Sequence, residues 1–218
     1  MHRDSIFYQL FRQSPTLLFE LLAQQPENVD QYVFEAIEVK ETSFRMDGAF
    51  LPPNPSGVVY FCEVQFQQDK LLYERMKSRW GLLSVRFTKQ RMVSEIDLYV
   101  YRNRERLFDW QAVVIYPTRS VEQSRRETVR EILESGRITR VYLDELGKIE
   151  ELPTGVGLMV LTTLEGDEAT TEAKGLIERS PTNRAIIDLI STIMVYKFSN
   201  LSSVFIRRKP PNKKTTRQ

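Results

Sequence analysis

The chain has 218 residues, of which 41% are hydrophobic and 11% aromatic, enough for the core of one large domain or two small ones. The net charge is only +2, so overall charge neither favours nor excludes a polyanionic partner. Cys62 is the only cysteine and His2 the only histidine, which excludes an intramolecular disulfide and argues against histidine-based catalysis and histidine-rich metal sites.

Targeting features are missing from the sequence. The first residues carry an acid, Asp4, and no long apolar segment, so we expect no signal peptide. No run of roughly eighteen apolar residues occurs, so we expect no membrane span. Together with the single thiol, this predicts a cytoplasmic protein.

The first third of the chain is expected to form helix followed by an antiparallel meander. Apolar residues recur at helical spacing over 4–24, and Pro15 is expected to divide this stretch into two short helices. The turn at 52–57 contains three prolines and a glycine, and separates two of the predicted strands. The strands are predicted over residues 32–39, 43–51 and 58–66.

The remaining elements alternate and then become helical. A long helix with one basic face is predicted over 71–89, and a continuous apolar run over 110–116 is typical of a central buried strand. A helix over 121–134 should end at Gly136. The other predicted elements are strands over 95–102 and 138–143 and helices over 155–164, 169–179 and 183–198.

Two acidic residues interrupt strand-like runs in the meander. Asp47 lies in Phe44-Arg45-Met46-Asp47-Gly48-Ala49-Phe50, and Glu63 lies in Val58-Val59-Tyr60-Phe61-Cys62-Glu63-Val64-Gln65-Phe66. Residues two apart on a strand share a face, so Gln65 lies beside Glu63, and Asp47 meets both if the two strands pair. Such an oxygen-rich pocket suits a hard divalent cation such as Mg²⁺, which in turn suits phosphodiester hydrolysis.

Each of these residues also has a plain structural interpretation. Asp47-Gly48 is common turn chemistry, and Glu63 could be a satisfied acid on an edge strand. Gln65 could belong to a solvated stripe, and Glu20 could be an ordinary exposed helical residue. The basic face of 71–89 could be solvated rather than bound to phosphates.

The order of these motifs resembles the PD-(D/E)XK nuclease superfamily. Over about residues 4–198 the chain is similar to the Rpn-type recombination-promoting nucleases and putative transposases, in the branch common in cyanobacteria. The strings that carry the resemblance are Asp4-Ser5-Ile6-Phe7-Tyr8, Phe19-Glu20-Leu21-Leu22, the two acidic motifs, Asp109-Trp110-Gln111-Ala112-Val113-Val114-Ile115-Tyr116-Pro117 and Val141-Tyr142-Leu143-Asp144-Glu145-Leu146.

The resemblance assigns roles to individual residues. Asp47 and Glu63 would bind Mg²⁺ or Mn²⁺, with the backbone carbonyl of Val64 as a further ligand. Gln65 occupies the position where the superfamily usually has lysine, and would position water or phosphate by neutral hydrogen bonds. Glu20 would be a helix-borne acid assisting the metal. DNA phosphates would be contacted by Lys70, Arg75, Lys77 and Arg79.

The expected fold is α/β, with a restriction-endonuclease-like mixed central sheet flanked by helices and a helical C-terminal extension. The core would span 1–150, the extension 151–203 and a basic disordered tail 204–218; the last twelve residues hold six cations and no acid. Similar proteins continue further, so a truncated copy would look like this.

The expected function is that of a Mg²⁺-dependent DNA endonuclease tied to transposition or recombination. The alternative is a catalytically inactive member of the same fold that binds DNA or protein. DNA is the expected partner, and a homodimer is one assembly that the sequence leaves open. A small-molecule hydrolase is disfavoured, because the chain has neither a glycine-rich phosphate loop nor a serine–histidine pair.

Overall fold

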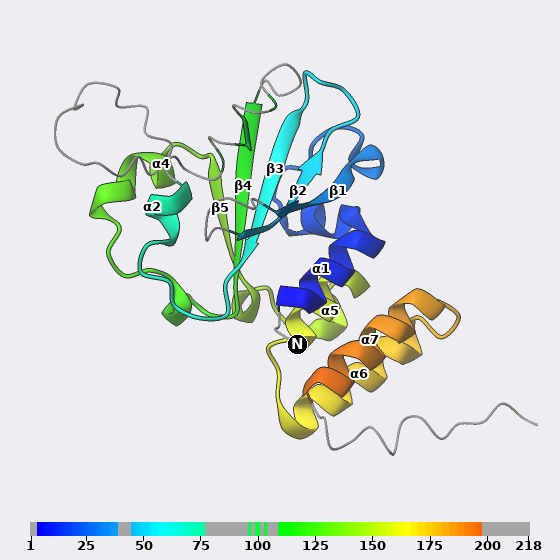
Figure 1. The fold of residues 1–218 in the computed structure, drawn as a ribbon. Coiled ribbons are helices and arrows are strands. Elements are labelled where there is room, and N and C mark those ends of the chain that lie inside the picture. The colour runs from blue at the N-terminus through cyan, green and yellow to red at the C-terminus, as the bar shows by residue number, and fades with distance from the viewer. Residues whose placement is uncertain are drawn as a thin grey trace, which may run out of the picture.

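Five strands form one mixed sheet in chain order (Figure 1). The computed structural model describes residues 4–38, 45–76, 96, 99–100, 103 and 109–197. The first three strands pair antiparallel, and the last two add parallel to the third. The strands are β1 (Val33–Glu38), β2 (Arg45–Leu51), β3 (Val58–Val64), β4 (Asp109–Tyr116) and β5 (Ile138–Tyr142).

The connections follow from the pairing. A short proline-rich turn suffices between β2 and β3, because the end of one antiparallel strand lies beside the start of the next. The N–H of Gly57 closes this turn by donating to the Asn54 carbonyl at 2.9 Å. A parallel pair needs a long crossover, and more than forty residues separate β3 from β4. The predicted meander and the buried strand over 110–116 are therefore confirmed.

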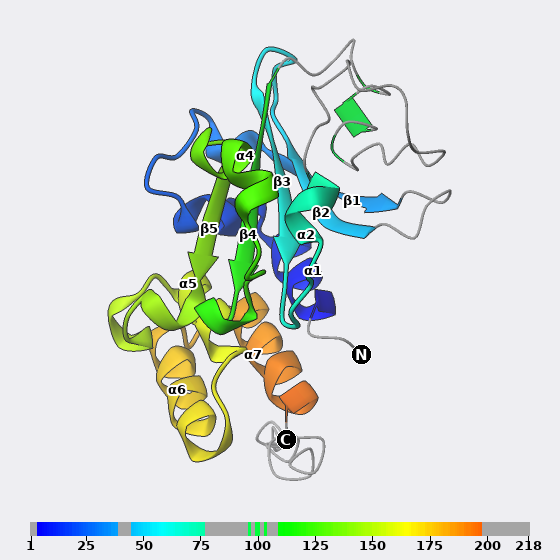
Figure 2. The same ribbon diagram turned by 90° about the vertical axis from the view of Figure 1, so that its left-hand side faces the viewer.

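One face of the sheet, here called the α1 face, carries Phe50, Tyr60 and Cys62 and is covered by the N-terminal helical elements; the C-terminal helices pack against these toward one end of the sheet (Figures 1 and 2). Pro15 divides the first helical stretch as predicted, and the second piece is a 3-10 helix. These elements are α1 (Asp4–Gln13), η1 (Pro15–Leu21), α5 (Thr154–Leu161), α6 (Gly166–Arg179) and α7 (Arg184–Lys197).

The C-terminal helices share this core with α1, since Leu158, Leu176 and Ile193 belong to the same buried cluster as Phe7. The three-part division of the chain stays a prediction, and its basic tail lies outside the described residues. None of the described helices is both long enough and apolar enough to cross a membrane.

The opposite face, here called the α2 face, carries Ala49, Phe61 and Val114. It is covered by α2 (Leu72–Met76), the 3-10 turn η4 (Glu127–Val129) and α4 (Arg130–Glu134). Further 3-10 turns are η2 (Val29–Gln31), η3 (Arg119–Val121), η5 (Leu143–Glu145) and η6 (Ile149–Glu151).

Two sequence expectations change on this face. The helix predicted over 121–134 is interrupted, because the segment between η3 and η4 turns Glu122 and Gln123 into the interior; it does end at Gly136, whose φ is +77°. The strand predicted over 95–102 is wrong at its described positions, since Ile96, Tyr99 and Val100 are helical. Beyond Met76 the predicted helix over 71–89 lies outside the described residues.

The mixed sheet with helices on both faces and helices following it places the chain in the α/β class. The arrangement is consistent with a restriction-endonuclease-like fold, as the sequence predicts.

Candidate functional site

The two acidic motifs are brought together at the paired ends of β2 and β3. The register pairs Ala49 with Phe61 and Gly48 with Cys62, and Asp47 and Glu63 are the next residues on the two strands. A bulge in the pairing of β1 with β2 falls at this point, where Asp47 and Gly48 together face the single residue Ala36. Ala49 and Phe61 both point to the α2 face, and residues two apart on a strand share a face. Glu63 therefore lies on the α2 face, whereas Asp47, which lies in the bulge, is placed by its hydrogen bond to β3.

A backbone hydrogen bond fixes the Asp47 carboxylate. Its Oδ2 accepts the N–H of Val64 at 2.6 Å, a short distance typical of a charged acceptor. This contact ties the first acid to the residue that follows the second acid. The carboxylate of Asp47 is thus held at the end of β3, beside Glu63.

The surroundings of the pair are apolar and electrostatically negative. Glu63 is only 7% exposed, whereas Asp47 is half-buried. Burial raises the pKa of the Cys62 thiol well above its ordinary value, and the charges of Asp47 and Glu63 raise it further. The charges of both carboxylates therefore act on the residue that precedes Glu63 on β3.

Gln65 lies directly beyond the end of β3. Its N–H donates to the Ile115 carbonyl at 2.8 Å, which continues the pairing with β4. Its side-chain Nε2 donates to the Gln67 carbonyl. The amide nitrogen is therefore used in a local turn, and Gln65 remains at the strand end where the sequence places it.

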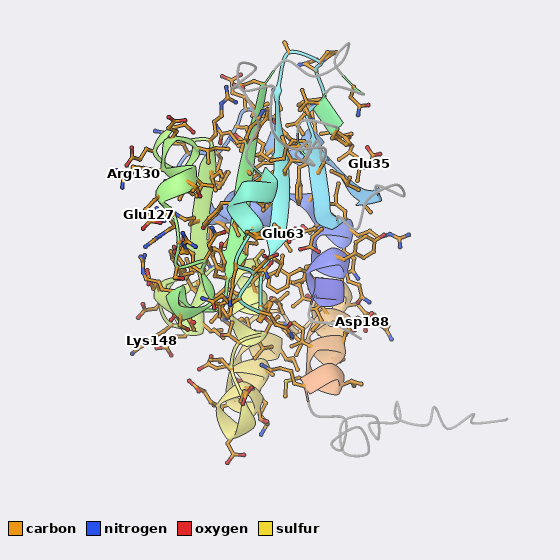
Figure 3. All side chains as sticks on the ribbon, turned by 60° about the vertical axis from the view of Figure 1, so that its left-hand side comes forward. Glu35, Glu63, Glu127, Arg130, Lys148 and Asp188 are labelled. Atoms are coloured by element: carbon orange, nitrogen blue, oxygen red, sulfur yellow. The ribbon has the colours of Figure 1, made fainter. Side chains whose placement is uncertain are left out.

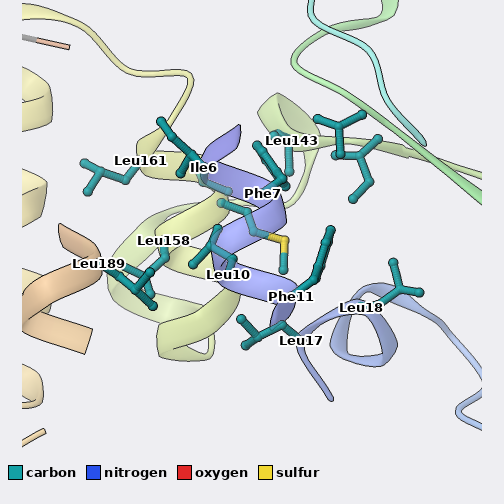
Figure 4. Packing of buried hydrophobic residues seen from close by; sticks show 14 of the residues in the cluster. Ile6, Phe7, Leu10, Phe11, Leu17, Leu18, Leu143, Leu158, Leu161 and Leu189 are labelled. Atoms are coloured by element: carbon teal, nitrogen blue, oxygen red, sulfur yellow. The ribbon is translucent and has the colours of Figure 1, made fainter. Parts of the chain in front are cut away.

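Glu20 is not brought to this pair. It lies on η1, whose neighbouring residues Leu17, Leu18 and Phe19 belong to the core of the α1 face (Figure 4). A Cβ added to Gly155, at the start of α5, would lie 3.4 Å from the Glu20 Oε2. The carboxylate therefore lies beside α5, on the side of the sheet opposite to Glu63, and its assistance to a metal stays a prediction.

The predicted phosphate contacts are only partly described. Lys70 is exposed in the turn before α2, directly after the strand that carries Glu63. Arg75 lies in α2, but its side chain is outside what the structure describes, and Lys77 and Arg79 lie outside the described residues altogether. Phosphate contact by these four residues stays a prediction.

The oxygen donors present fit a Mg²⁺ ion better than a metal that needs nitrogen or sulfur ligands. The described residues contain no group of three or more His, Cys, Asp or Glu side chains suited to a metal. Mg²⁺ is commonly bound by one or two carboxylates, with waters and substrate phosphates completing an octahedron. Asp47 and Glu63 would supply two carboxylates, and the Val64 carbonyl would supply one further oxygen ligand.

Comparison with known proteins gives a family. The family model DUF2887, described as a protein of unknown function, matches residues 3–90 and 85–208. The chain belongs to this family. No curated protein and no solved structure matches it.

A second polar centre, which no sequence motif predicts, lies on the α2 face around Glu122. Glu122 is 7% exposed and accepts hydrogen bonds from the Tyr73 hydroxyl at 2.6 Å and the Tyr142 hydroxyl at 2.7 Å. Arg126 and Arg140 each donate Nη1 to its carboxylate at 3.2 Å. Glu122 thereby joins α2, β5 and the segment before η4.

The charge of Glu122 is stabilised by these partners. Burial by itself raises the pKa of the carboxyl, but hydrogen bonds from Tyr73, Tyr142 and Arg140 and the charge of Arg126 more than offset it, so the pKa lies below its ordinary value. Burial raises the pKa of the Tyr142 hydroxyl to about 12, and its hydrogen bond to Glu122 adds to that rise. No local pattern marks Glu122, because three of its four partners, Tyr73, Arg140 and Tyr142, come from distant segments.

Proposed function

We propose that this protein is a Mg²⁺-dependent DNA endonuclease of the PD-(D/E)XK type, acting in transposition or recombination. One observation carries the proposal: the Asp47 carboxylate on β2 accepts the N–H of Val64, the residue that follows Glu63 on β3. The Rpn-type resemblance of the same motifs supports it, and so does the mixed sheet on which they lie.

The chemistry assigns different tasks to the neighbouring residues. A Mg²⁺ ion bound by Asp47, Glu63 and the Val64 carbonyl would activate water and neutralise charge on the scissile phosphate. The Val64 N–H holds Asp47 in position for this, and the apolar surroundings of Glu63 limit the access of bulk water. Gln65 would orient the water or the phosphate through neutral hydrogen bonds.

The test compares plasmid nicking and metal binding in isosteric variants. Asp47→Asn keeps an acceptor for the Val64 N–H, and Glu63→Gln keeps the side-chain shape, so both should fold while losing Mg²⁺-dependent nicking. Mn²⁺ binding, followed by electron paramagnetic resonance, should weaken in parallel. Asp144→Asn, an exposed acid on η5, is the matched control and should behave like wild type. Full nicking by both site variants refutes the proposal.

A second candidate is a catalytically inactive protein of the same fold that binds DNA or another protein. Gln65 favours it, because a neutral amide engaged with the Gln67 carbonyl cannot supply the cation usual at this position. Wild-type protein that binds Mn²⁺ and DNA yet leaves supercoiled DNA intact in Mg²⁺ would identify this candidate. A homodimer remains a prediction for either function.

A further inference from the structure

Three arginines from separate positions surround one pocket on the α2 side of the molecule. The pocket has a volume of about 300 Å³ and is lined by Arg126, Arg130 and Arg140, with the Ser124 hydroxyl and the carboxylates of Glu127 and Glu134. Arg126 precedes η4, Arg130 begins α4, and Arg140 lies on β5. Figure 3 shows Arg130 and Glu127 on the α4 side and Glu63 beside α2.

Two of the guanidinium groups are held in place by a buried carboxylate at the inner side of the pocket. Arg126 and Arg140 each donate Nη1 to the buried Glu122 carboxylate, one to each oxygen. A guanidinium has five N–H donors in a rigid fork, so these contacts leave most donors of both groups for a ligand. Anchoring before the ligand arrives reduces the entropy that binding must overcome.

The acids on the pocket wall interact with the third arginine without forming an ion pair: backbone hydrogen bonds lower the pKa of the Glu127 carboxyl, and the charges of Arg125 and Arg130 lower it further. Glu127 Oε2 accepts the backbone N–H of Arg126 at 3.1 Å, which turns its carboxylate toward the main chain. Within the part of the chain that the structure describes, Arg130 forms no ion pair with Glu127 or Glu134. Arg130 is exposed, so its guanidinium is accessible to a ligand.

The pocket lies on the same face of the sheet as Glu63. The register pairs Glu63 with Val114 on β4 and Val114 with Arg140 on β5, and all three point to the α2 face. Neighbouring strands are about 4.8 Å apart, so Arg140 is about 10 Å from Glu63 along this row. This separation is short enough for one DNA strand to contact both places.

We propose that the Arg126–Arg130–Arg140 pocket binds a phosphate group of a DNA backbone. Arginine forks match the oxygens of a phosphate, and the Ser124 hydroxyl adds a further donor. The pocket would hold the DNA strand near the scissile phosphodiester bond, which would lie at Asp47 and Glu63. This placement rests on the proposed function, whereas phosphate binding by the pocket does not. Contacts of this kind position a strand without reading its sequence.

The test measures DNA binding without metal. Fluorescence anisotropy of a labelled DNA duplex in EDTA reports affinity for wild type, Arg130→Gln and Arg125→Gln at salt concentrations between about 50 and 200 mM. Arg125 is exposed and adjacent in sequence but does not line the pocket, so it is the matched control. Because both positions are exposed, both variants should unfold at the wild-type temperature.

The expected result is a loss of about tenfold in affinity for Arg130→Gln and a salt slope shallower by about 0.9, with Arg125→Gln close to wild type. Equal affinity and slope in all three proteins overturns the proposal. A second arm measures thermal stabilisation by inorganic phosphate: a shift lost in Arg130→Gln while duplex binding stays unchanged identifies a small phosphate ligand and overturns the DNA assignment.

The outcome is separable from that of the proposed function. The binding assay contains no metal and uses proteins with Asp47 and Glu63 intact, so it does not depend on cleavage. Full nicking by Asp47→Asn and Glu63→Gln together with weakened binding by Arg130→Gln would support phosphate binding by the pocket and refute only the proposed nuclease site.

Discussion

The polar centre around Glu122 gives the sharpest stability prediction, through Tyr73→Phe. Tyr73 on α2 is fully buried, and its hydroxyl donates to Glu122 at 2.6 Å while accepting the Tyr116 hydroxyl at 2.9 Å. The substitution removes one oxygen and keeps the ring. It deletes a hydrogen bond to a charged group and leaves the Tyr116 hydroxyl without its acceptor.

The expected cost follows from these two losses. A hydrogen bond to a charged group contributes about 1.5–3 kcal/mol, and an orphaned buried hydroxyl costs about 1–3 kcal/mol. Partial relaxation of Tyr116 lowers the sum, so we expect about 3 kcal/mol less free energy of unfolding. For a chain of this length each kcal/mol shifts the melting temperature by about 2–4 °C, which predicts a fall of about 6–12 °C.

Differential scanning calorimetry and urea titration measure this change. The matched control is Tyr99→Phe, whose hydroxyl reaches the exposed Glu35 carboxylate at a marginal 3.5 Å and should contribute less than about 1 kcal/mol. A double-mutant cycle with Glu122→Gln should give a coupling energy above about 1 kcal/mol. If Tyr73→Phe and Tyr99→Phe lower stability equally, the buried network does not contribute as described.

Three further predictions concern pH, catalysis and packing. The Glu122 carboxyl has a lowered pKa in the folded state, so its contribution to stability is fully present above its pKa in the unfolded chain, about 4.3, and is lost as pH falls through the folded pKa. The difference in free energy of unfolding between wild type and Glu122→Gln should therefore shrink on acidification below about pH 4.5. A difference that widens contradicts this reasoning. Gln65→Lys places a cation at the usual position and should speed nicking if the proposed nuclease is active, whereas Gln65→Met should not. Leu18→Ala should cost about 2–5 kcal/mol in urea titration because Leu18 is fully buried, while Leu71→Ala, which is 55% exposed, should cost little.

The strands were predictable because their sequence pattern reflects burial. The run at 112–116 is apolar throughout because β4 is central and covered on both faces, as the burial of Val113 and Val114 shows. The acids in β2 and β3 stand out against such runs, and the pairing of the strands then decides that they meet. The candidate site was therefore accessible from local pattern and one assumption about pairing.

The error at 95–102 came from choosing the wrong period. Ile96, Tyr99 and Val100 stand at i, i+3 and i+4, which is helical spacing, and all three pack on the α2 face. The β-branched and aromatic residues favoured a strand by propensity. Spacing was the stronger signal, because it reports which side chains can reach the core together.

Glu20 and Glu122 show what local pattern cannot supply. The sequence around Glu20 predicts a helix, but its side of the sheet depends on how η1 packs after Pro15. Periodicity predicts a helix at Glu122, yet this residue lies between two 3-10 turns and forms hydrogen bonds with residues up to 49 positions away in the chain. Tertiary hydrogen bonds from tyrosines and arginines outweigh the helical propensity of this segment.

The Glu122 centre also connects the two candidate sites physically. Tyr73 lies on α2, which follows the strand that carries Glu63, and Arg126 and Arg140 line the proposed phosphate pocket. Tyr73→Phe should therefore weaken duplex binding as well as stability, because Glu122 then holds the two arginines less firmly. Weakened binding at a temperature where the variant is fully folded would attribute the effect to arginine positioning, since global unfolding would then contribute nothing.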